Sequence, residues 1–206
     1  GTAVCDDGVV IDLSAMRTVW VDPAGRTAWV QGGALWGDVD HETQAHGLAT
    51  TGGIVSHTGV AGLTLGGGVG WLMRKHGLTV DNLLAVDVVT ADGERLRPFE
   101  DEHPDLFWAL RGGGGNFGVV TSFEFRLHAV GPTVLAGPIL WDATDAGEVL
   151  RFYRDFVRDA PDALGTVVRF GTAPPLPVIP ENLHWRPVVM IGTCYAGPIE
   201  DGEQVL

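Results

Sequence analysis

The feature that most constrains the fold of this 206-residue chain is a glycine-rich stretch from Thr51 to Trp71. Eight of its 21 residues are glycine, and its apolar residues stand singly or in pairs. This pattern predicts neither a long helix nor a regular strand. Glycine at this density indicates left-handed or tightly turned backbone, or backbone that approaches another group closely. We expect the stretch either to wrap a large ligand or to form a tight structural loop.

The ligand interpretation rests on main-chain N–H groups and a few small polar side chains. Successive N–H groups in tight turns form concave sites for anions. Ser56, His57 and Thr58 add polar side chains within the stretch. This combination suits a pyrophosphate bound without lysine, and equally a polar heteroaromatic ring whose edge needs several hydrogen bonds. Both ligand types stay open, beside the possibility that the glycines only shape a core.

Composition narrows the class of protein. With 45% hydrophobic and 19% charged residues, the chain has enough apolar material for a globular core. Its net charge of −13 disfavours partners with a phosphate backbone and anionic membranes. Cys5 and Cys194 are too far apart to indicate a disulfide framework or a zinc site, and no metal site is expected. No run of about 18 apolar residues predicts a membrane span.

Hydrophobic periodicity and turn residues predict alternating strands and helices, with a boundary at Gly131-Pro132. The stretch 119–128 alternates strictly between two faces and predicts a period-2 strand. Four prolines at 173–180 predict a loop. The remaining predicted strands cover residues 9–13, 18–22, 27–31, 83–90, 94–97, 134–140, 166–172 and 188–195, and the predicted helices cover 34–46, 71–76, 104–110, 144–160 and 200–206.

A second glycine-rich loop, residues 112–118, contains Gly-x-Gly-x-x-Gly at Gly113, Gly115 and Gly118. A dinucleotide-binding fingerprint needs a strand before this motif and a helix after it. Here a predicted helix precedes it and a strand follows, so the Rossmann interpretation is rejected. The chain also lacks a P-loop motif and a Gly-x-Ser-x-Gly nucleophile elbow. The spacing of His41 and His46 does not suit a shared zinc face.

Four segments together resemble the berberine-bridge-enzyme-like oxidases of the vanillyl-alcohol oxidase / p-cresol methylhydroxylase (PCMH) superfamily. They are residues 30–37 (VQGGALWG), 58–83 (TGVAGLTLGGGVGWLMRKHGLTVDNL), 87–93 (DVVTADG) and 105–120 (DLFWALRGGGGNFGVV). Within that family the chain is more similar to bacterial members related to 6-hydroxy-nicotine oxidase than to the plant alkaloid enzymes. The match covers nearly all of residues 1–131.

The resemblance implies an α+β fold with FAD as the cofactor. Residues 1–131 would form a PCMH-type FAD-binding domain that lacks its N-terminal subdomain. Residues 132–206 would begin a substrate-binding domain built on an antiparallel sheet. The chain starts without methionine and resembles the interior of a longer protein, so the resemblance implies poor FAD binding by this part alone. Cytoplasmic and secreted locations both stay open, and so does the oligomeric state.

The resemblance also selects the residues expected to contact the cofactor. Val55 stands where many relatives carry a cysteine bonded to the flavin, which excludes a cysteinyl bond there. Leu63 replaces a histidine of the plant enzymes, and the family's second attachment point, a histidine loop, belongs upstream of Gly1. The predicted cofactor-binding residues are Gly53, Val55, Ser56, His57, Thr58, Gly59, Gly62, Leu63, Gly68, Asn116, Gly118, Val119 and Val120.

The implied reaction is oxidation of a C–H group that bears an alcohol or an amine in a small-molecule substrate. Hydride would pass to flavin N5, with O2 as the acceptor. A dehydrogenase with another acceptor, or a truncated domain without catalysis, are the alternatives. No catalytic residue is assigned, because Tyr153 and Tyr195 fit core or interface positions better than the role of base.

Overall fold

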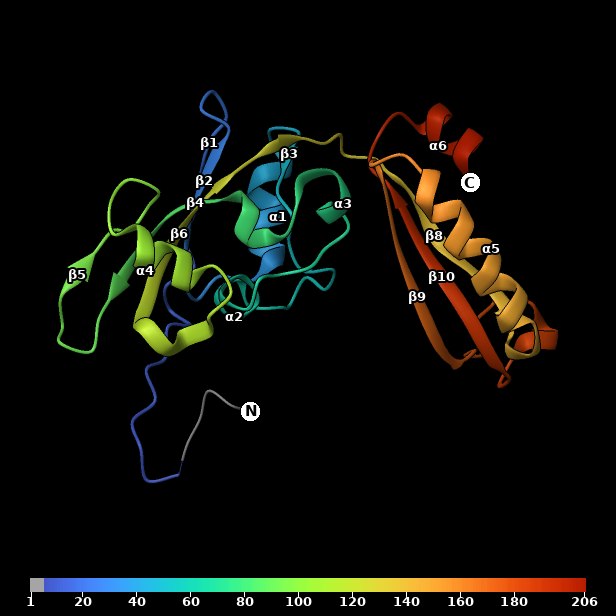
Figure 1. The fold of residues 1–206 in the computed structure, drawn as a ribbon, viewed down its shortest axis with the longest axis horizontal. Helices are drawn as coiled ribbons and strands as arrows, with labels where there is room; N and C mark the ends of the chain where they lie inside the picture. The colour runs from blue at the N-terminus through green and yellow to red at the C-terminus, as the bar shows by residue number, and fades with distance from the viewer. Residues whose placement is uncertain (1–5) are drawn as a thin grey trace. The chain divides into compact units, whose positions relative to one another are not determined.

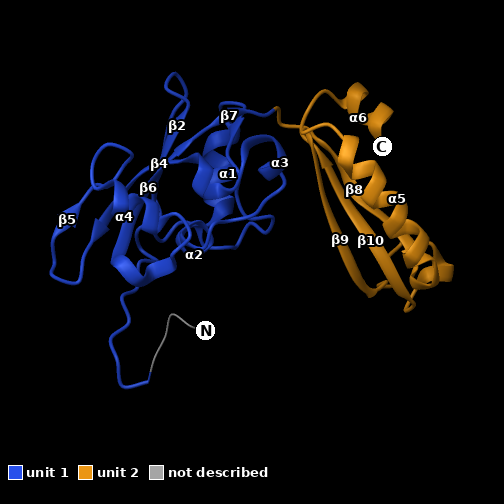
Figure 2. Cartoon of the chain, viewed as in Figure 1, with its two compact units in different colours: residues 1–130 blue, residues 131–206 orange. Residues whose placement is uncertain are grey.

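The computed structural model describes residues 6–206 and separates into two compact units, Gly1–Val130 and Gly131–Leu206 (Figure 2). Unit 1 is built on a five-stranded antiparallel sheet with the strand order β1-β2-β6-β4-β5 (Figure 1). The strands are β1 (Val19–Asp22), β2 (Thr27–Gln31), β4 (Leu83–Val89), β5 (Arg95–Leu96) and β6 (Val119–Arg126).

Short helices and turns fill the connections of unit 1. The α-helices are α1 (Trp36–Gln44), α2 (Val60–Leu65), α3 (Met73–His76) and α4 (Pro104–Leu110), and the 3-10 turns are η1 (Thr79–Asn82) and η2 (Gly114–Phe117). A separate two-stranded ladder joins β3 (Leu48–Ala49) to β7 (His128–Ala129). The predicted helix over 104–110 is confirmed, with Pro104 in the first turn, where its missing N–H costs no hydrogen bond.

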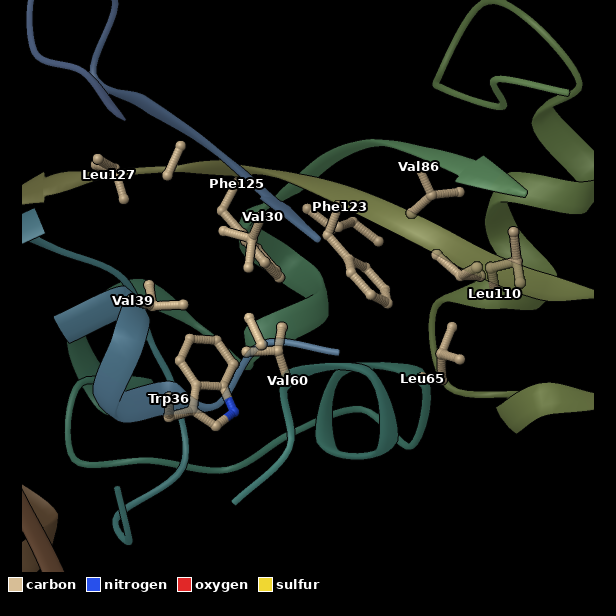
Figure 3. Close-up of a cluster of buried hydrophobic side chains, with 14 of the residues drawn as sticks. Val30, Trp36, Val39, Val60, Leu65, Val86, Leu110, Phe123, Phe125 and Leu127 are labelled. Carbon is tan, nitrogen blue, oxygen red and sulfur yellow. The ribbon is translucent and has the colours of Figure 1, made fainter. Parts of the chain in front are cut away.

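The core of unit 1 lies between the sheet and helices α1 and α2 (Figure 3). Trp36 is only 1% exposed and its ring lies 5.8 Å from that of Phe125. The other side chains labelled in this cluster are Val30, Val39, Val60, Leu65, Val86, Leu110, Phe123 and Leu127. Burying such side chains contributes about 1.5–3 kcal/mol each. The packing of Trp36 therefore fixes the start of α1 beside the glycine-rich stretch.

The predicted strict alternation along 119–128 is wrong, because β6 contains a β-bulge. The register with β4 shifts between Asp87 and Val88, which leaves Thr121 without an opposing residue. A bulge places two consecutive side chains on the same face and so changes the phase of a strand. Val120 and Phe123 both face the core, whereas Ser122 binds Asp87 on the other face.

Asp87 is the centre of a polar network on that second face of the sheet. It accepts hydrogen bonds from Ser122 Oγ, from Trp29 Nε1 at 3.4 Å and from Arg97 at 3.0 Å. Partial burial alone would raise the pKa of the Asp87 carboxyl, but the Ser122 hydrogen bond and the Arg97 ion pair lower it below its usual value. The network therefore holds Asp87 in its ionised form.

Two further predictions in unit 1 need correction. The strand predicted for residues 9–13 is an exposed irregular segment, with Val9 89% exposed. Within the described residues no strand pairs with it, and an unpaired extended segment gains no ladder hydrogen bonds. The helix predicted for 71–76 begins only at Met73, because Trp71 and Leu72 form a turn that follows Gly70.

Unit 2 is a three-stranded antiparallel sheet with one long helix against it. The strand order is β8 (Leu135–Asp142), β10 (Pro187–Tyr195) and β9 (Leu164–Thr172). Helix α5 (Ala146–Asp159) packs Val149 onto Val189 and Ile191, and α6 (Ile199–Val205) follows β10. The turns η3 (Ala143–Asp145) and η4 (Glu181–Leu183) complete the unit, and the proline-rich loop at 173–180 is confirmed as largely irregular.

The helix predicted for 144–160 is confirmed as α5, and its apolar side chains are only partly covered. Val149 is buried and Tyr153 donates to or accepts from Thr166 Oγ1 at 2.8 Å, whereas Phe152 is 64% exposed.

Cys194 is a free thiol on β10 whose pKa is raised by burial, and Cys5 lies outside the described residues. No helix in residues 6–206 is long and apolar enough to cross a membrane.

Candidate functional site

The two ends of the glycine-rich stretch are held together by main-chain packing. A Cβ placed on Gly70 would lie 1.9 Å from the carbonyl oxygen of Gly52. A Cβ on Gly52 would in turn lie 2.4 Å from the indole ring of Trp36. A side chain at either position would clash with neighbouring atoms, so packing requires glycine at Gly52 and Gly70. They define a closed loop whose middle part, residues 53–69, extends from this junction.

The first half of the loop is attached to α1 through its main chain. The N–H groups of Trp36 and Gly37 donate to the carbonyl oxygens of Thr58 and Ser56, at 2.9 and 2.8 Å. These donors belong to the first turn of α1, where N–H groups have no partner inside the helix. The carbonyls of the loop thus cap α1. The side chains of Ser56 and His57 are left exposed.

The second half of the loop presents bare main chain. Gly59 and Gly62, on either side of the start of α2, are both exposed, and a Cβ on either would meet nothing within 4 Å. Gly67 is similarly open and has a left-handed φ of 104°. In contrast, a Cβ on Gly68 would lie 2.2 Å from Thr79 Oγ1, so Gly68 is required by packing. The surface at Gly59 and Gly62 is therefore open to close approach by a ligand.

Exposed apolar side chains surround this open main chain. Val55 and Val69 are 42% and 61% exposed, and Ile54, Met73 and Leu78 are exposed as well. Single exposed apolar residues are common, but three of these lie within residues 53–69 and the other two follow it closely in the sequence, which indicates a contact surface. The stretch therefore combines bare amides with an apolar lining.

The second glycine-rich loop lies next to the first, because η2 contacts α2. Asn116 donates its side-chain amide to the Gly113 carbonyl at 2.8 Å, which closes the turn. Gly118 has a φ of 141°, and a Cβ there would lie 2.5 Å from the Val89 carbonyl oxygen. The structure thus brings the two loops together, although they are about 50 residues apart in the sequence.

The predicted cofactor residues differ in how accessible they are. Exposed residues are Val55, Ser56, His57, Gly59, Gly62 and Asn116; half-buried residues are Gly53, Thr58, Leu63, Gly68, Gly118 and Val119. Val120 is buried in the core at 3% exposure and offers a ligand only its main chain. The cofactor contacts of these thirteen residues stay a prediction.

Sequence reasoning missed the residues that fix the far end of the stretch. Asn82 is 2% exposed and donates its amide to the carbonyls of His76 and Leu78, at 3.0 and 2.9 Å. Its side-chain oxygen lies 2.6 Å from His128 Nε2, and the His128 ring stacks on that of His76. No local pattern predicts this cluster, because His128 is 46 residues from Asn82.

The two tyrosines have structural partners. Tyr153 is bonded to Thr166 between α5 and β9, and Tyr195 is buried against Gly202 of α6. Across residues 6–206 no group of three or more His, Cys, Asp or Glu side chains is arranged to hold a metal ion.

Comparison with known proteins identifies the class of this fold and site. Residues 1–97 match a family model described as an FAD binding domain. The solved structure of 6-hydroxy-D-nicotine oxidase from Arthrobacter nicotinovorans superposes with a TM-score of 0.85 at 36% identity, and the match covers 98% of this chain and 43% of that one. These findings confirm the predicted α+β fold of the PCMH type, with FAD as its cofactor.

Two relatives compared by sequence define this similarity more closely. An FAD-linked oxidoreductase from Dictyostelium discoideum, DDB_G0289697, is 39% identical over 203 residues, which are 98% of this chain and 42% of the relative. The (R)-6-hydroxynicotine oxidase of Paenarthrobacter nicotinovorans is 45% identical over 141 residues, which are 68% of this chain and 31% of the relative. Over nearly its whole length the chain is thus similar to FAD-linked oxidoreductases with an FAD-binding domain of the PCMH type. It spans less than half the length of the relatives compared here.

Proposed function

We propose that residues 1–131 contribute part of an FAD-binding domain and that residues 132–206 begin the substrate-binding domain of an oxidoreductase. The observation that carries this proposal is the open main chain at Gly59 and Gly62, next to the second glycine-rich loop. A flat ligand with phosphates needs bare N–H groups and an apolar surface side by side, and both are found along residues 53–69.

The residues present fit FAD in a second respect. The hydroxyl groups of Thr50, Thr64 and Thr79 are buried and have no hydrogen-bond partner among the described residues. A buried hydroxyl without a partner costs about 1–3 kcal/mol, so such groups indicate an environment completed by a polar ligand. All three lie in or next to the glycine-rich stretch.

The roles of the chain's own groups follow from this geometry. Bound FAD supplies the capacity to accept a hydride at N5, which no amino-acid side chain provides. The amides and side chains of Ser56, His57 and Thr58 would orient the polar edge of the cofactor. Gly59 and Gly62 would allow it to reach the main chain, and Val55 would provide an apolar contact without a covalent bond.

The proposed reaction is oxidation of a C–H group next to an alcohol or amine of a sugar, alkaloid or other secondary metabolite. O2 is the proposed acceptor, since the relative from Paenarthrobacter nicotinovorans is named an oxidase. An FAD-dependent dehydrogenase with a non-oxygen acceptor is the second candidate, because the Dictyostelium relative carries only the broader name of oxidoreductase. Hydrogen peroxide formed in step with substrate oxidation distinguishes the two.

The cofactor proposal is tested by Gly62→Ala in the protein expressed from its complete reading frame. The added methyl group meets no protein atom, so folding is unaffected, but it projects into the open surface and is expected to reduce FAD occupancy at least about tenfold. Gly171→Ala is the matched control, since its Cβ is also unobstructed and it lies in unit 2. Flavin absorbance per protein is the measurement. Equal flavin content in Gly62→Ala and wild type, or no flavin in wild type, contradicts the proposal.

A further inference from the structure

The rings of His76 and His128 are stacked face to face, and this pair closes the far end of the glycine-rich stretch. Their centroids lie 3.7 Å apart and their planes differ by 8°. His76 is the last residue of α3 and His128 is the first residue of β7. The two histidines are far apart in the sequence, and the stack joins their segments together with Asn82, which bonds to both residues.

The hydrogen bonds of Asn82 identify which ring nitrogen of His128 carries a hydrogen. The Asn82 amide nitrogen faces two carbonyl oxygens, those of His76 and Leu78, so it is the donor end of the side chain. The Asn82 oxygen is therefore an acceptor, and His128 Nε2 must donate its hydrogen to it at 2.6 Å. His128 thus carries a hydrogen on Nε2, and this hydrogen bond is the same in the neutral and in the protonated ring. A second proton can be added only at Nδ1.

The surroundings of the stack oppose that second proton. Burial, and after it the positive groups of His76, Arg126, Lys75 and Arg26 in that order, together lower the pKa of His128 to about 4. Burial and Lys75 also lower the pKa of His76. These groups come from α3, from β6 and from the turn between β1 and β2. A charged ring in this position is repelled from every one of these elements.

The His76–His128 stack joins the segments that precede and follow the glycine-rich stretch. His128 pairs with Ala49 in the β3–β7 ladder, two residues before Thr51. His76 ends the helix that follows Trp71, and the Asn82 amide also lies 3.5 Å from Thr51 Oγ1. Opening the stack therefore frees α3 and removes one of the restraints on the return of the loop.

We propose that the His76–His128 stack is an acid-sensitive latch that holds α3 and the end of the glycine-rich stretch against β7, and that it opens when either ring is protonated. The contact is given by the ring stack and the Asn82 hydrogen bond, and its response to acid follows from the burial of both rings and the positive groups around them. Its consequence, weaker retention of FAD in acid, rests on the proposed function. In the opened state the two histidine rings have an ordinary pKa and bind protons more readily than in the closed state, so acidification favours opening.

Hydrogen exchange of residues 72–80 in the purified full chain without added FAD tests the latch. After correction for the intrinsic exchange rate, protection of this segment is expected to fall about tenfold or more between pH 7 and pH 4.5. The reason is that the pKa of His128 is lowered in the closed state, although the ring is partly exposed. The paired variant His76→Phe with His128→Gln keeps a ring and an amide donor but cannot titrate, so its protection should not respond. His41→Gln, at an exposed histidine of α1, should retain the wild-type response.

A titration of the histidine ring signals of the wild-type chain by NMR supplies a measurement that does not depend on the variants folding. Both latch histidines should titrate below the ordinary range. The proposal is overturned if they titrate near 6.5, or if the paired variant loses protection in acid as the wild type does. Because this experiment contains no FAD, a failure to bind the cofactor would leave its result unaffected and would count only against the proposed function.

Discussion

The close approach of Gly52 and Gly70 makes a specific prediction about the stability of unit 1. In Gly70→Ala the new methyl group would lie 1.9 Å from the Gly52 carbonyl oxygen, whereas real Cβ contacts below 3.0 Å essentially never occur. The two main-chain segments must therefore separate by more than about 1 Å. Gly52 cannot retreat, because it already packs against the Trp36 ring on its other side.

The expected cost follows from two opposing effects. Overpacking of this kind destabilises a protein by about 1–3 kcal/mol. Replacing glycine also restricts the unfolded chain, which returns about 0.4–1 kcal/mol. We expect a net loss of about 1–2 kcal/mol, because the nearest neighbours of the new methyl group are main-chain atoms of Gly52 and not the end of a flexible side chain. With a urea dependence of about 2 kcal/mol per molar, the middle of the usual range, the unfolding midpoint of unit 1 should fall by roughly 0.5–1 M.

Urea unfolding followed by tryptophan fluorescence measures this change, since Trp36 is buried beside the junction. Gly62→Ala is the internal comparison, because it lies in α2 and its Cβ is unobstructed. Alanine is favoured over glycine in a helix by about 0.8–1 kcal/mol, so this variant should unfold at the same or a higher urea concentration. A Gly70→Ala midpoint equal to the wild-type midpoint would refute the packing argument.

Three further predictions concern other parts of the molecule. Ser122→Ala should raise the pKa of Asp87 toward its ordinary value and cost about 1 kcal/mol near pH 7, discounted for the partial exposure of Asp87. A carboxyl group with a lowered pKa loses its contribution as the pH falls through that pKa, so the urea midpoints of variant and wild type should converge as the pH falls below the ordinary pKa of an aspartate. A difference that stays constant with pH would contradict this. Tyr153→Phe should cost about 0.5–1.5 kcal/mol in unit 2 by removing the bond to Thr166, measured by thermal unfolding, and an unchanged melting temperature would show that the bond contributes nothing. Acid denaturation of the flavin-loaded full-length protein should release no flavin attached to residues 51–71, because Val55 cannot form a thioether; a flavin peptide from this segment would disprove it.

Much of the fold could be predicted because its elements carry local signals. Pro104 begins α4 at the predicted residue, and the turn at Pro23 to Arg26 joins two strands with β-branched and aromatic residues. The bulge at Thr121 could not be predicted, because it depends on how β6 registers with β4 rather than on the sequence of β6. The segment 9–13 has the composition of a strand but no partner, and composition carries no information about partners.

The candidate site likewise has a part that could be predicted from the sequence and a part that could not. Glycine density alone indicated an unusual main chain at residues 51–71, and the structure separates two reasons for it. Gly52, Gly68 and Gly70 are required by contacts with other parts of the chain, whereas Gly59 and Gly62 face open space. Composition could not separate these two groups, because a close neighbour and an open surface both favour glycine.

The way in which residues 56–58 hold α1 has a consequence for how the site can change. Only their main-chain groups serve the helix, through the carbonyls of Ser56 and Thr58, and the described structure shows no hydrogen bond made by the side chains of Ser56, His57 or Thr58. A substitution at any of these positions therefore leaves the cap of α1 in place. At this tripeptide, libraries of variants can explore new ligand chemistry at little risk to folding, while Gly52, Gly68 and Gly70 must be kept constant.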